Sequence, residues 1–364
     1  MVAPLQTLKM LNNYEVPYSL KEIFSSFFHS KGANPGFLSE KGFTYRVSSG
    51  RGAIYTILLD IKKSKGVGEI ICPNYSCKAI PRAIMKAGFT PIFVDVNESI
   101  SIDPVQLKKA INPLTKAIIF YHPWGFEHSK EVVKIAKKNE IILIEDSAQA
   151  IGKKIGNWGD YSFFSFRTSK IIQVGSGGAI ISKKRIELPF KKHQKIISLF
   201  NFLDLIFRKF YNWPKPRAII EFFIEKGDNR QMGGFEETLL SKGLISLDKN
   251  IKKREHNYNE LRKAISNSHH FKNILFNRPI SPLYFAFLTD NKERVLYLFK
   301  KKGVSATAYY SHVNSDNFDF NFFGKEKSAF FSRKIINIPL HDGLSEKELN
   351  TIKEIIKDID NGIK

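Results

Sequence analysis

Apolar and polar positions follow two alternating periods between Thr44 and Ile181. Four short apolar runs rich in β-branched residues predict strands, at 68–73, 90–96, 116–122 and 140–146. Three segments with apolar positions at helical spacing lie among them, at 77–88, 103–111 and 129–139. Such alternation predicts parallel βαβ units, and the continuous apolar strands predict a sheet covered by helices on both faces.

Ligands of an open parallel sheet gather beyond the carboxyl ends of its strands. Asn74, His122 and Asp146 stand at or just after those ends. We therefore expect the chemistry of this chain near these three residues.

The pattern changes in the last third of the chain. A long helical pattern covers 236–266, and the later segments predict a strand, a helix, two strands and a final helix, with the strands at 281–290, 304–310 and 334–340. Ser345 and Glu348 form a capping box that predicts the start of the final helix. The expected organisation is an N-terminal segment at 1–34, a large domain at 35–265 and a smaller α+β domain at 266–364.

Residues 190–227 interrupt this organisation with an apolar stripe at helical spacing. The stripe consists of Ile196, Leu199, Phe200, Leu203, Phe207 and Phe210, widened by Phe202, Leu205 and Ile206. Asn201 and Asp204 interrupt the run, which is too short to span a bilayer. Basic flanks and Trp213 suit a helix that lies in a membrane interface. A helical hairpin packed on its own domain, or on a dimer partner, would show the same pattern.

Composition narrows the class of protein. The chain has 364 residues, 43% of them hydrophobic and 25% charged, which is enough for two globular domains. Its 57 basic and 35 acidic residues give a net charge of +22, which favours anionic partners, although a lysine-rich genome would give the same composition without any function. The lysines are scattered in pairs and no recognition helix is visible, so we expect no nucleic acid partner.

The cysteines and the N-terminus indicate the compartment. Cys72 and Cys77 have no second pair that would complete a zinc site or a disulfide framework, so we expect no metal site and a reducing environment. The first twenty residues lack the pattern of a signal peptide. We expect a cytoplasmic protein, with the inner face of the membrane as the alternative that the segment 190–227 leaves open.

Three features of the sequence carry candidate chemistry. Asp146, in "EDSAQA", follows a buried strand, where a carboxylate needs a cationic or proton-bearing partner unless it merely caps the next helix. The turn "SSGRGAI" precedes a helix whose first N–H groups can bind a phosphate. Lys170 precedes the glycine-rich "GSGG", and a buried lysine amine can react with carbonyl compounds. An amine, an acid and an anion-binding helix start are the parts that hold pyridoxal phosphate.

With these blocks the sequence resembles the DegT/DnrJ/StrS family of sugar aminotransferases, which have the fold type I architecture. The resemblance runs from about residue 35 to the C-terminus and is carried by "SSGRGA", "CPNYSCKAIPRAIMKAGFTPIFVDV", "HPWG", "EDSAQAIG", "GDYSFFSFRTSK", "GSGGAI" and "IINIPLHDGLSEKEL". It implies an α/β fold: a large domain with a mostly parallel seven-stranded sheet flanked by helices, and a smaller C-terminal α+β domain. It also implies a homodimer.

The resemblance assigns roles to single residues. Lys170 would hold the cofactor covalently and move a proton during transfer, and Asp146 would pair with the pyridinium nitrogen. Gln149 would lie near the phenolic oxygen of the ring. The phosphate would be held by Ser165 and by the turn of Gly50, Arg51 and Gly52. The resemblance also places His122 and Trp124 along the pocket, and Arg167 and Tyr310 are further candidates for substrate contact.

Several positions depart from the family pattern. Cys77 stands where relatives usually have an aromatic side chain that stacks on the cofactor ring, and Tyr75 or Trp124 could substitute. The segment "GDNRQM" keeps Asn229, which in relatives reaches the phosphate of the partner subunit, but has Arg230 and Gln231 where relatives have Tyr and Arg. Ser176 replaces a usual glutamate.

The resemblance implies transfer of an amine from L-glutamate to a keto-sugar linked to a nucleoside diphosphate, for surface polysaccharide or glycolipid synthesis. Arg46, Arg51 and Arg167 could attract the diphosphate or the glutamate carboxylate. One alternative is a sugar dehydratase with the same cofactor; dehydrating relatives typically have His at the position of Lys170. Another is a non-catalytic protein that binds a membrane surface with the same fold.

Overall fold

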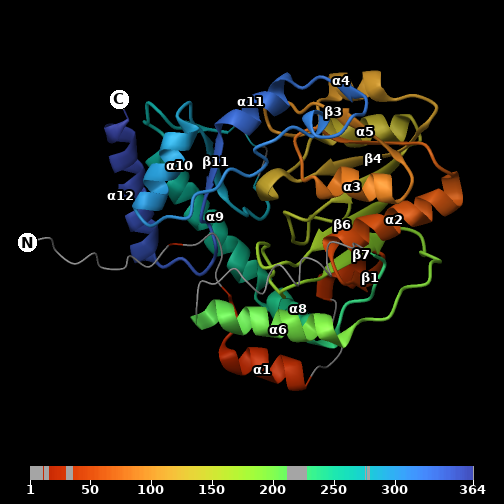
Figure 1. Ribbon diagram of the computed structural model, residues 1–364, viewed down its shortest axis with the longest axis horizontal. Coiled ribbons are helices and arrows are strands. Elements are labelled where there is room, and N and C mark those ends of the chain that lie inside the picture. The colour runs from red at the N-terminus through yellow and green to blue at the C-terminus, as the bar shows by residue number, and fades with distance from the viewer. Residues whose placement is uncertain are drawn as a thin grey trace, which may run out of the picture.

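The computed structural model describes residues 11, 16–29, 36–210, 228–274, 276 and 279–363. Its centre is an eight-stranded sheet of order β1-β7-β6-β5-β4-β2-β3-β10 (Figure 1). The strands are β1 (Phe43–Val47), β2 (Glu69–Pro73), β3 (Thr90–Val94), β4 (Thr115–Tyr121), β5 (Ile142–Asp146), β6 (Tyr161–Ser165), β7 (Gly178–Ser182) and β10 (Phe322–Phe323). All neighbours are parallel except those of β7, which pairs antiparallel with β1 and β6. The α/β class and the mostly parallel sheet are confirmed.

The sheet has one strand more than the seven expected. The additional strand β10 is two residues long, comes from the C-terminal third of the chain and pairs with β3. No apolar run of strand length marks it in the sequence, because its backbone is held by the edge of a sheet that the rest of the chain has already formed. It brings C-terminal residues to the large sheet.

Helices cover both faces of the sheet, as the strand pattern predicts. They are α2 (Gly50–Lys65), α3 (Ala79–Lys86), α4 (Pro104–Ala110) and α5 (Lys130–Lys138). Ile70 and Ile119 belong to the apolar cluster that α2 and α3 cover, whereas Ile71 and Ile118 belong to the cluster under α4 and α5. Since side chains alternate along a strand, both faces are buried and the carboxyl ends of the strands remain for the site.

The long helical pattern at 236–266 forms two helices that follow each other directly, α8 (Gly234–Ile245) and α9 (Leu247–Ala264). Two helices from earlier in the chain lie near α8, namely α1 (Leu20–Phe28) and α6 (Lys195–Phe210). Figure 1 shows α1, α6 and α8 together at one end of the molecule. Short 3-10 helices are η1 (Gly36–Lys41), η2 (Pro123–Gly125) and η3 (Asn314–Asp316).

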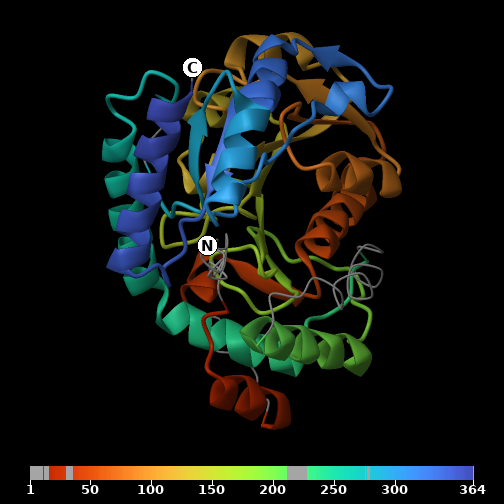
Figure 2. The same ribbon diagram turned by 60° about the vertical axis from the view of Figure 1, so that its left-hand side comes forward.

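The C-terminal part contains a separate antiparallel sheet of order β11-β9-β8. Its elements are β8 (Lys272–Asn273), β9 (Phe285–Leu288), α10 (Lys292–Lys301), α11 (Glu326–Lys334), β11 (Ile335–Ile338) and α12 (Glu346–Gly362). Figure 2 shows α9 and α12 side by side at the edge of the molecule. The capping box at the start of α12 is confirmed, because the Ser345 hydroxyl accepts from the Glu348 N–H and the Glu348 carboxylate accepts from the Ser345 N–H.

The predicted strand at 304–310 is wrong. In the structure this segment has only two isolated bridges, Val304 with Leu11 and Thr307 with Asn337, and the backbone of Tyr310 has a φ of 54°, which no strand residue adopts. The turn at Tyr310 points the preceding chain toward the carboxyl ends of the large sheet.

Candidate active site

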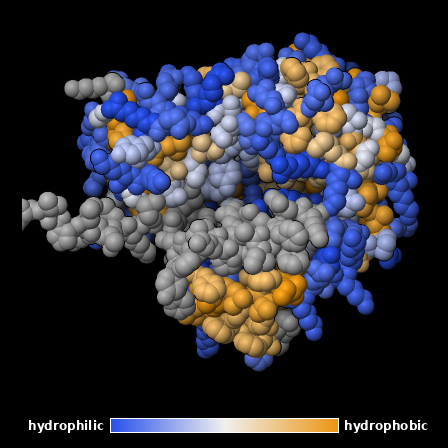
Figure 3. Space-filling view, in the orientation of Figure 1, coloured by the Kyte–Doolittle hydropathy of each residue, from blue (hydrophilic) through white to orange (hydrophobic). Residues whose placement is uncertain are grey.

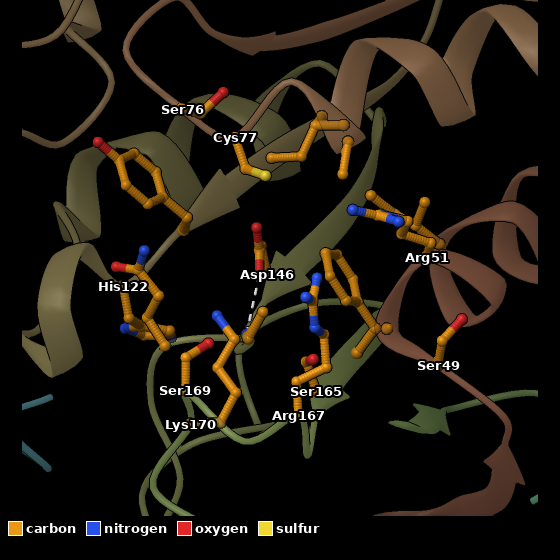
Figure 4. Close-up of a pocket in the computed structure, with 18 of the residues that line it drawn as sticks. Ser49, Arg51, Ser76, Cys77, His122, Asp146, Ser165, Arg167, Ser169 and Lys170 are labelled. Carbon is orange, nitrogen blue, oxygen red and sulfur yellow. Dashed lines mark hydrogen bonds between the residues drawn. The ribbon is translucent and has the colours of Figure 1, made fainter. Parts of the chain in front are cut away.

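A cavity lies at the carboxyl ends of β4, β5 and β6 (Figure 4). Its walls come from the start of α2, the loop after β2, the ends of the three strands, the loop between β6 and β7, and the segment around Tyr310. Across the strands, Asp146 pairs with Tyr121 on one side and Phe163 on the other, so the register itself brings these three residues to the same edge. The site lies where the strand pattern predicts it.

The carboxyl group of Asp146 is buried at the base of the cavity. Its Oδ1 accepts a hydrogen bond of 2.8 Å from the Ala148 N–H. Burial raises the pKa of Asp146 to about 6, although the Ala148 bond and the positive charge of Lys170 lower it. The sequence left open a capping role, and the structure shows both the Ala148 bond and a carboxyl group that lines the cavity. A protonated ring nitrogen beside it would supply a further positive charge and favour the ionised carboxylate.

Lys170 lies in the loop between β6 and β7, and its side chain enters the same cavity (Figure 4). Burial lowers the pKa of the Lys170 amine, against the opposing effects of Cys77 and Asp146, while the charge of Arg167 lowers it further. A lowered pKa increases the fraction of neutral amine, which is the form that attacks a carbonyl carbon. The glycine turn after it has the positive φ expected, 89° at Gly175 and 132° at Gly177.

The start of α2 forms a cradle opposite Ser165. A Cβ atom at Gly50 would lie 2.8 Å from the Ser165 Cβ and 3.1 Å from its hydroxyl oxygen, so only glycine leaves this space open. The hydroxyl of Ser49 caps the helix and accepts a 3.0 Å hydrogen bond from the Gly52 N–H. Gly52 therefore does not line the cavity, whereas Ser49, Gly50, Arg51 and Ser165 do. The N-terminal end of this 16-residue helix favours an anion.

Gln149 is fixed from two sides. Its side-chain oxygen accepts from the Trp124 N–H at 2.8 Å, and its amide nitrogen donates to the Tyr310 hydroxyl at 2.6 Å. Gln149 and Tyr310 line the cavity. Trp124 does not: its side chain is fully buried behind the wall and acts through its backbone.

His122 lines the cavity between Tyr121 and the buried Glu145. Its Nε2 lies 2.9 Å from Oε1 of Glu145, and its Nδ1 has no hydrogen-bond partner within the described part of the chain. Asn74, also expected at a strand end, instead bonds Ser315 through both its side-chain nitrogen and oxygen. It thereby joins the large sheet to the C-terminal part.

Cationic side chains stand at the cavity and beyond it. Arg51 and Arg167 line it, so a ligand with several negative charges would meet both. Arg46 does not line it, since its Nε lies 2.7 Å from a carboxylate oxygen of Glu237.

The departures from the family pattern have definite places in the structure. Cys77 lines the cavity, and Tyr75 does not: Tyr75 is fully buried and its hydroxyl donates to the Tyr309 carbonyl. Neither Tyr75 nor Trp124 is therefore placed to stack on a ligand in the cavity. Asn229 also lies outside the cavity of its own chain and donates to the Pro189 carbonyl. Ser176 accepts a 2.6 Å hydrogen bond from Asn201 of α6.

Sequence reasoning missed several cavity residues. They include Ser49, Ser76, Tyr121, Phe163, Ser169 and Tyr309. Ser49 could have been found, because a serine before a glycine-rich helix start is a typical cap. Tyr309 gave no signal, since it reaches the cavity from a segment about 160 residues beyond Asp146, with no motif around it.

The described residues fit pyridoxal phosphate. The cradle at Gly50 and Ser165 leaves space for a phosphate at a helix start, the buried carboxyl group of Asp146 has a raised pKa, and the Lys170 amine enters the same cavity. The layered sheet and this pocket define a fold type I aminotransferase.

The chain belongs to the DegT/DnrJ/EryC1/StrS aminotransferase family, whose model matches residues 37–357. Among curated relatives, GDP-perosamine synthase of Escherichia coli O157:H7 is 36% identical over 38% of this chain and 40% of its own length. Spore coat polysaccharide biosynthesis protein SpsC of Bacillus subtilis is 23% identical over 82% of both chains. The chain thus matches about two fifths of the perosamine synthase but most of SpsC.

Solved structures confirm the fold over nearly the whole chain. Helicobacter pylori PseC, an aminotransferase of pseudaminic acid biosynthesis, has a TM-score of 0.77 at 19% identity and covers 98% of this chain and 100% of its own. The sugar aminotransferase Spr1654 of Streptococcus pneumoniae, solved in its PMP form, has a TM-score of 0.76 at 17% identity, covering 97% of this chain and 98% of its own.

Proposed function

We propose that this protein is a pyridoxal-phosphate-dependent aminotransferase that moves an amine from L-glutamate to a keto-sugar linked to a nucleoside diphosphate. One observation carries the proposal: a lysine amine of lowered pKa and a carboxyl group of raised pKa enter the same cavity beside a helix start. When bound, pyridoxal phosphate supplies the electron sink that stabilises negative charge at the carbon bearing the amine.

We assign a different role to each of the main cavity residues. Ser165, Gly50 and Arg51, which line the cavity at the helix start, would hold the phosphate, and Asp146 would balance the charge of the ring nitrogen. Lys170 would anchor the cofactor through its amine and, once that amine is released, would serve as the group that accepts and donates the proton. Arg167 is close enough to affect the Lys170 pKa, so it is placed to bind the glutamate carboxylate or a sugar diphosphate near the reacting carbon.

Lysine at position 170 favours amine transfer over the dehydratase alternative. The role in surface polysaccharide or glycolipid synthesis is supported by relatives such as SpsC. A cytoplasmic location follows from the sugar-nucleotide acceptor of the proposed reaction. No helix in the described ranges is long and apolar enough to cross a membrane.

We also propose a homodimer and a division of the chain near residue 265. The dimer is supported by Asn229, which the family pattern assigns to the phosphate of a neighbouring subunit and which lies outside its own cavity. Light scattering with and without pyridoxal phosphate would test the assembly, and a monomer at all concentrations would overturn it.

The cofactor is tested by the visible absorption spectrum, with and without borohydride. Wild type with pyridoxal phosphate should show a band that borohydride fixes irreversibly to the chain, and Lys170→Ala should not. Lys183→Ala is a matched control, because Lys183 lies at the far end of β7, exposed beside Asp160. An unchanged band in Lys170→Ala would contradict the assignment.

The substrate class is tested separately, by mass spectrometry of nucleotide-linked keto-sugars incubated with glutamate. The expected product has gained an amine and lost a carbonyl oxygen, with one 2-oxoglutarate formed for each product. If glutamate converts the cofactor to its amine form but no aminated sugar nucleotide appears, the result would support transaminase activity and contradict the proposed class of acceptor. Loss of a sugar hydroxyl without gain of an amine would indicate the dehydratase.

A further inference from the structure

Helix α6 turns three polar side chains toward the protein and leaves three large apolar side chains exposed. Ser198, Asn201 and Asp204 are buried, with exposed fractions of 8%, 0% and 3%. Ile196, Leu199 and Phe207 are exposed by 42%, 39% and 44%. Ile197, Phe202 and Leu205 are buried, so α6 also packs apolar side chains on the protein. The exposed members of the stripe are left on its solvent side, where a surface helix ordinarily carries polar residues.

Hydrogen bonds hold α6 in this orientation. Asn201 donates to Ser176 at 2.6 Å and to Glu236 at 2.5 Å, and Ser198 donates to Glu236 at 2.7 Å. Arg208 bonds Asp204 at 2.7 Å within α6 itself, which pairs the Asp204 charge but does not tie the helix to the rest of the chain. A rotation of α6 that buried the exposed apolar side chains would break the bonds of Asn201 and Ser198 to residues outside the helix. The polar groups would gain no better partner in return, so the observed orientation is stable.

Helix α1 packs beside α6 and extends the same surface. The rings of Phe24 and Phe202 are 5.2 Å apart, and Phe24 and Phe28 are exposed by 45% and 68%. We call the surface formed by Phe24, Phe28, Ile196, Leu199 and Phe207 the apolar face (Figure 3). Five of the twelve large apolar side chains exposed in the described residues belong to it, so exposure is concentrated there rather than scattered.

Positive charge accompanies the apolar face. Lys21 on α1 and Lys192 and Lys195 at the start of α6 are exposed. The acidic groups of the two helices are engaged elsewhere: Asp204 is turned inward against Arg208, and Glu22 accepts hydrogen bonds from Ser19. Together with the net charge of +22, this leaves exposed lysines on or directly before the two helices that carry the apolar face.

We propose that the apolar face docks on an anionic lipid bilayer, with α1 and α6 lying in the plane of the interface. Phenylalanine and leucine side chains would enter the boundary between headgroups and acyl chains, and the lysines would contact the phosphate headgroups. The α6 helix has 16 residues and lies along the protein surface, so it would rest on the bilayer without crossing it. A second copy of this chain would also cover apolar side chains, but the exposed lysines of the two copies would then repel each other.

The test is co-sedimentation of the full-length protein with vesicles of phosphatidylcholine, with and without phosphatidylglycerol. Binding should require phosphatidylglycerol and should weaken as salt is raised. Leu199→Gln with Phe207→Gln should reduce the vesicle affinity at least about tenfold. Lys192→Gln with Lys195→Gln should reduce it roughly fivefold for each lysine.

Val105→Gln with Leu114→Gln is the matched control. These side chains are exposed by 60% and 59%, and α4, which carries Val105, lies at the opposite end of the molecule from α6 in Figure 1. The control pair should bind vesicles as wild type does, and all variants should retain the cofactor absorption band.

Two results would overturn the proposal. One is no sedimentation with phosphatidylglycerol vesicles even at low salt. The other is a combination of two observations: the Leu199→Gln, Phe207→Gln variant forms a smaller oligomer than wild type, and the wild type does not bind lipid. The apolar face would then be a contact between copies of the chain. Neither result depends on turnover, so failure of the proposed reaction would be seen independently.

Discussion

The imidazole Nε2 of His122 lies 2.9 Å from Oε1 of Glu145, and both side chains are fully buried next to the cavity. Glu145 also accepts hydrogen bonds from the N–H groups of Gly156 and Trp158 and from the Ser162 hydroxyl. The Glu145 carboxylate thus fixes the orientation of His122, of the loop that contains Gly156 and Trp158, and of strand β6. The residue that precedes Asp146 is therefore a positioning residue for the site.

Replacing this carboxylate should destabilise the fold. Glu145→Gln keeps the shape but leaves N–H donors facing an amide NH2, so we expect the free energy of unfolding to fall by about 3 kcal/mol. Urea denaturation measures this change. Glu131→Gln is the control, because Glu131 is exposed on α5 with only a 3.5 Å contact to Lys108, and it should shift stability by less than about 0.5 kcal/mol.

The same residue predicts a pH dependence. Burial alone would raise the pKa of Glu145, but hydrogen bonds from His122, Gly156 and Trp158 lower it from 4.5 to about 2. A lowered folded-state pKa gives stability that is present above pH 4.5 and is lost as pH falls toward 2. The difference in stability between wild type and Glu145→Gln should therefore shrink on acidification. A difference in stability that stays constant as pH falls to about 2 would mean that these hydrogen bonds do not favour the ionised carboxylate.

The raised pKa of Asp146 predicts the opposite dependence of stability on pH. Burial raises its pKa from 3.8 to about 6, so the folded state binds the proton more tightly and stability falls as pH rises through that interval. In the cofactor-free protein, Asp146→Asn should raise the free energy of unfolding at pH 7 by up to about 3 kcal/mol, while weakening retention of pyridoxal phosphate. Asp319→Asn, at an exposed position, should do neither. Thermal denaturation at two pH values, with and without cofactor, measures both effects.

Gly50 predicts a selective loss of anion binding. Gly50→Ala places a methyl group 2.8 Å from the Ser165 Cβ, which closes the cradle at the start of α2. We expect an affinity for pyridoxal phosphate at least about tenfold lower, and weaker competition by inorganic phosphate. Gly362→Ala is the control, since nothing lies within 4 Å of a Cβ there and alanine favours the helix. Equal cofactor titrations for both variants would exclude the cradle as the phosphate site.

The sequence predicted the large sheet and the centre of the site because both depend on local signals. Apolar runs defined the strands, and Asp146, Ser165 and Lys170 stand at strand ends or in glycine-rich loops that a pattern reveals. Tyr309 and the short β10 depend on contacts between distant segments, which no local pattern records. The segment at 304–310 has β-branched and aromatic residues, yet the left-handed turn at Tyr310 directs it to the cavity instead of a sheet.

The orientation of α6 shows a different limit. Periodicity located the stripe from Ile196 to Phe207 and left open whether it faces its own domain, a partner or a membrane. The side of the helix that faces inward is decided by Glu236 and Ser176, which bond the polar residues of α6 from outside that segment. A helical pattern fixes which residues share a face but not which face is buried.

The hydrogen bond between Asn201 and Ser176 makes α6 part of the turn that follows Lys170. Ser176 lies between Gly175 and Gly177, which both have positive φ values. A surface contact at α6 and a ligand in the cavity would then be thermodynamically coupled through one short turn. Such coupling is reciprocal: whatever factor docking imposes on affinity in the cavity, an occupied cavity imposes on docking. Docking at a membrane would therefore change the affinity of the cavity for its ligand.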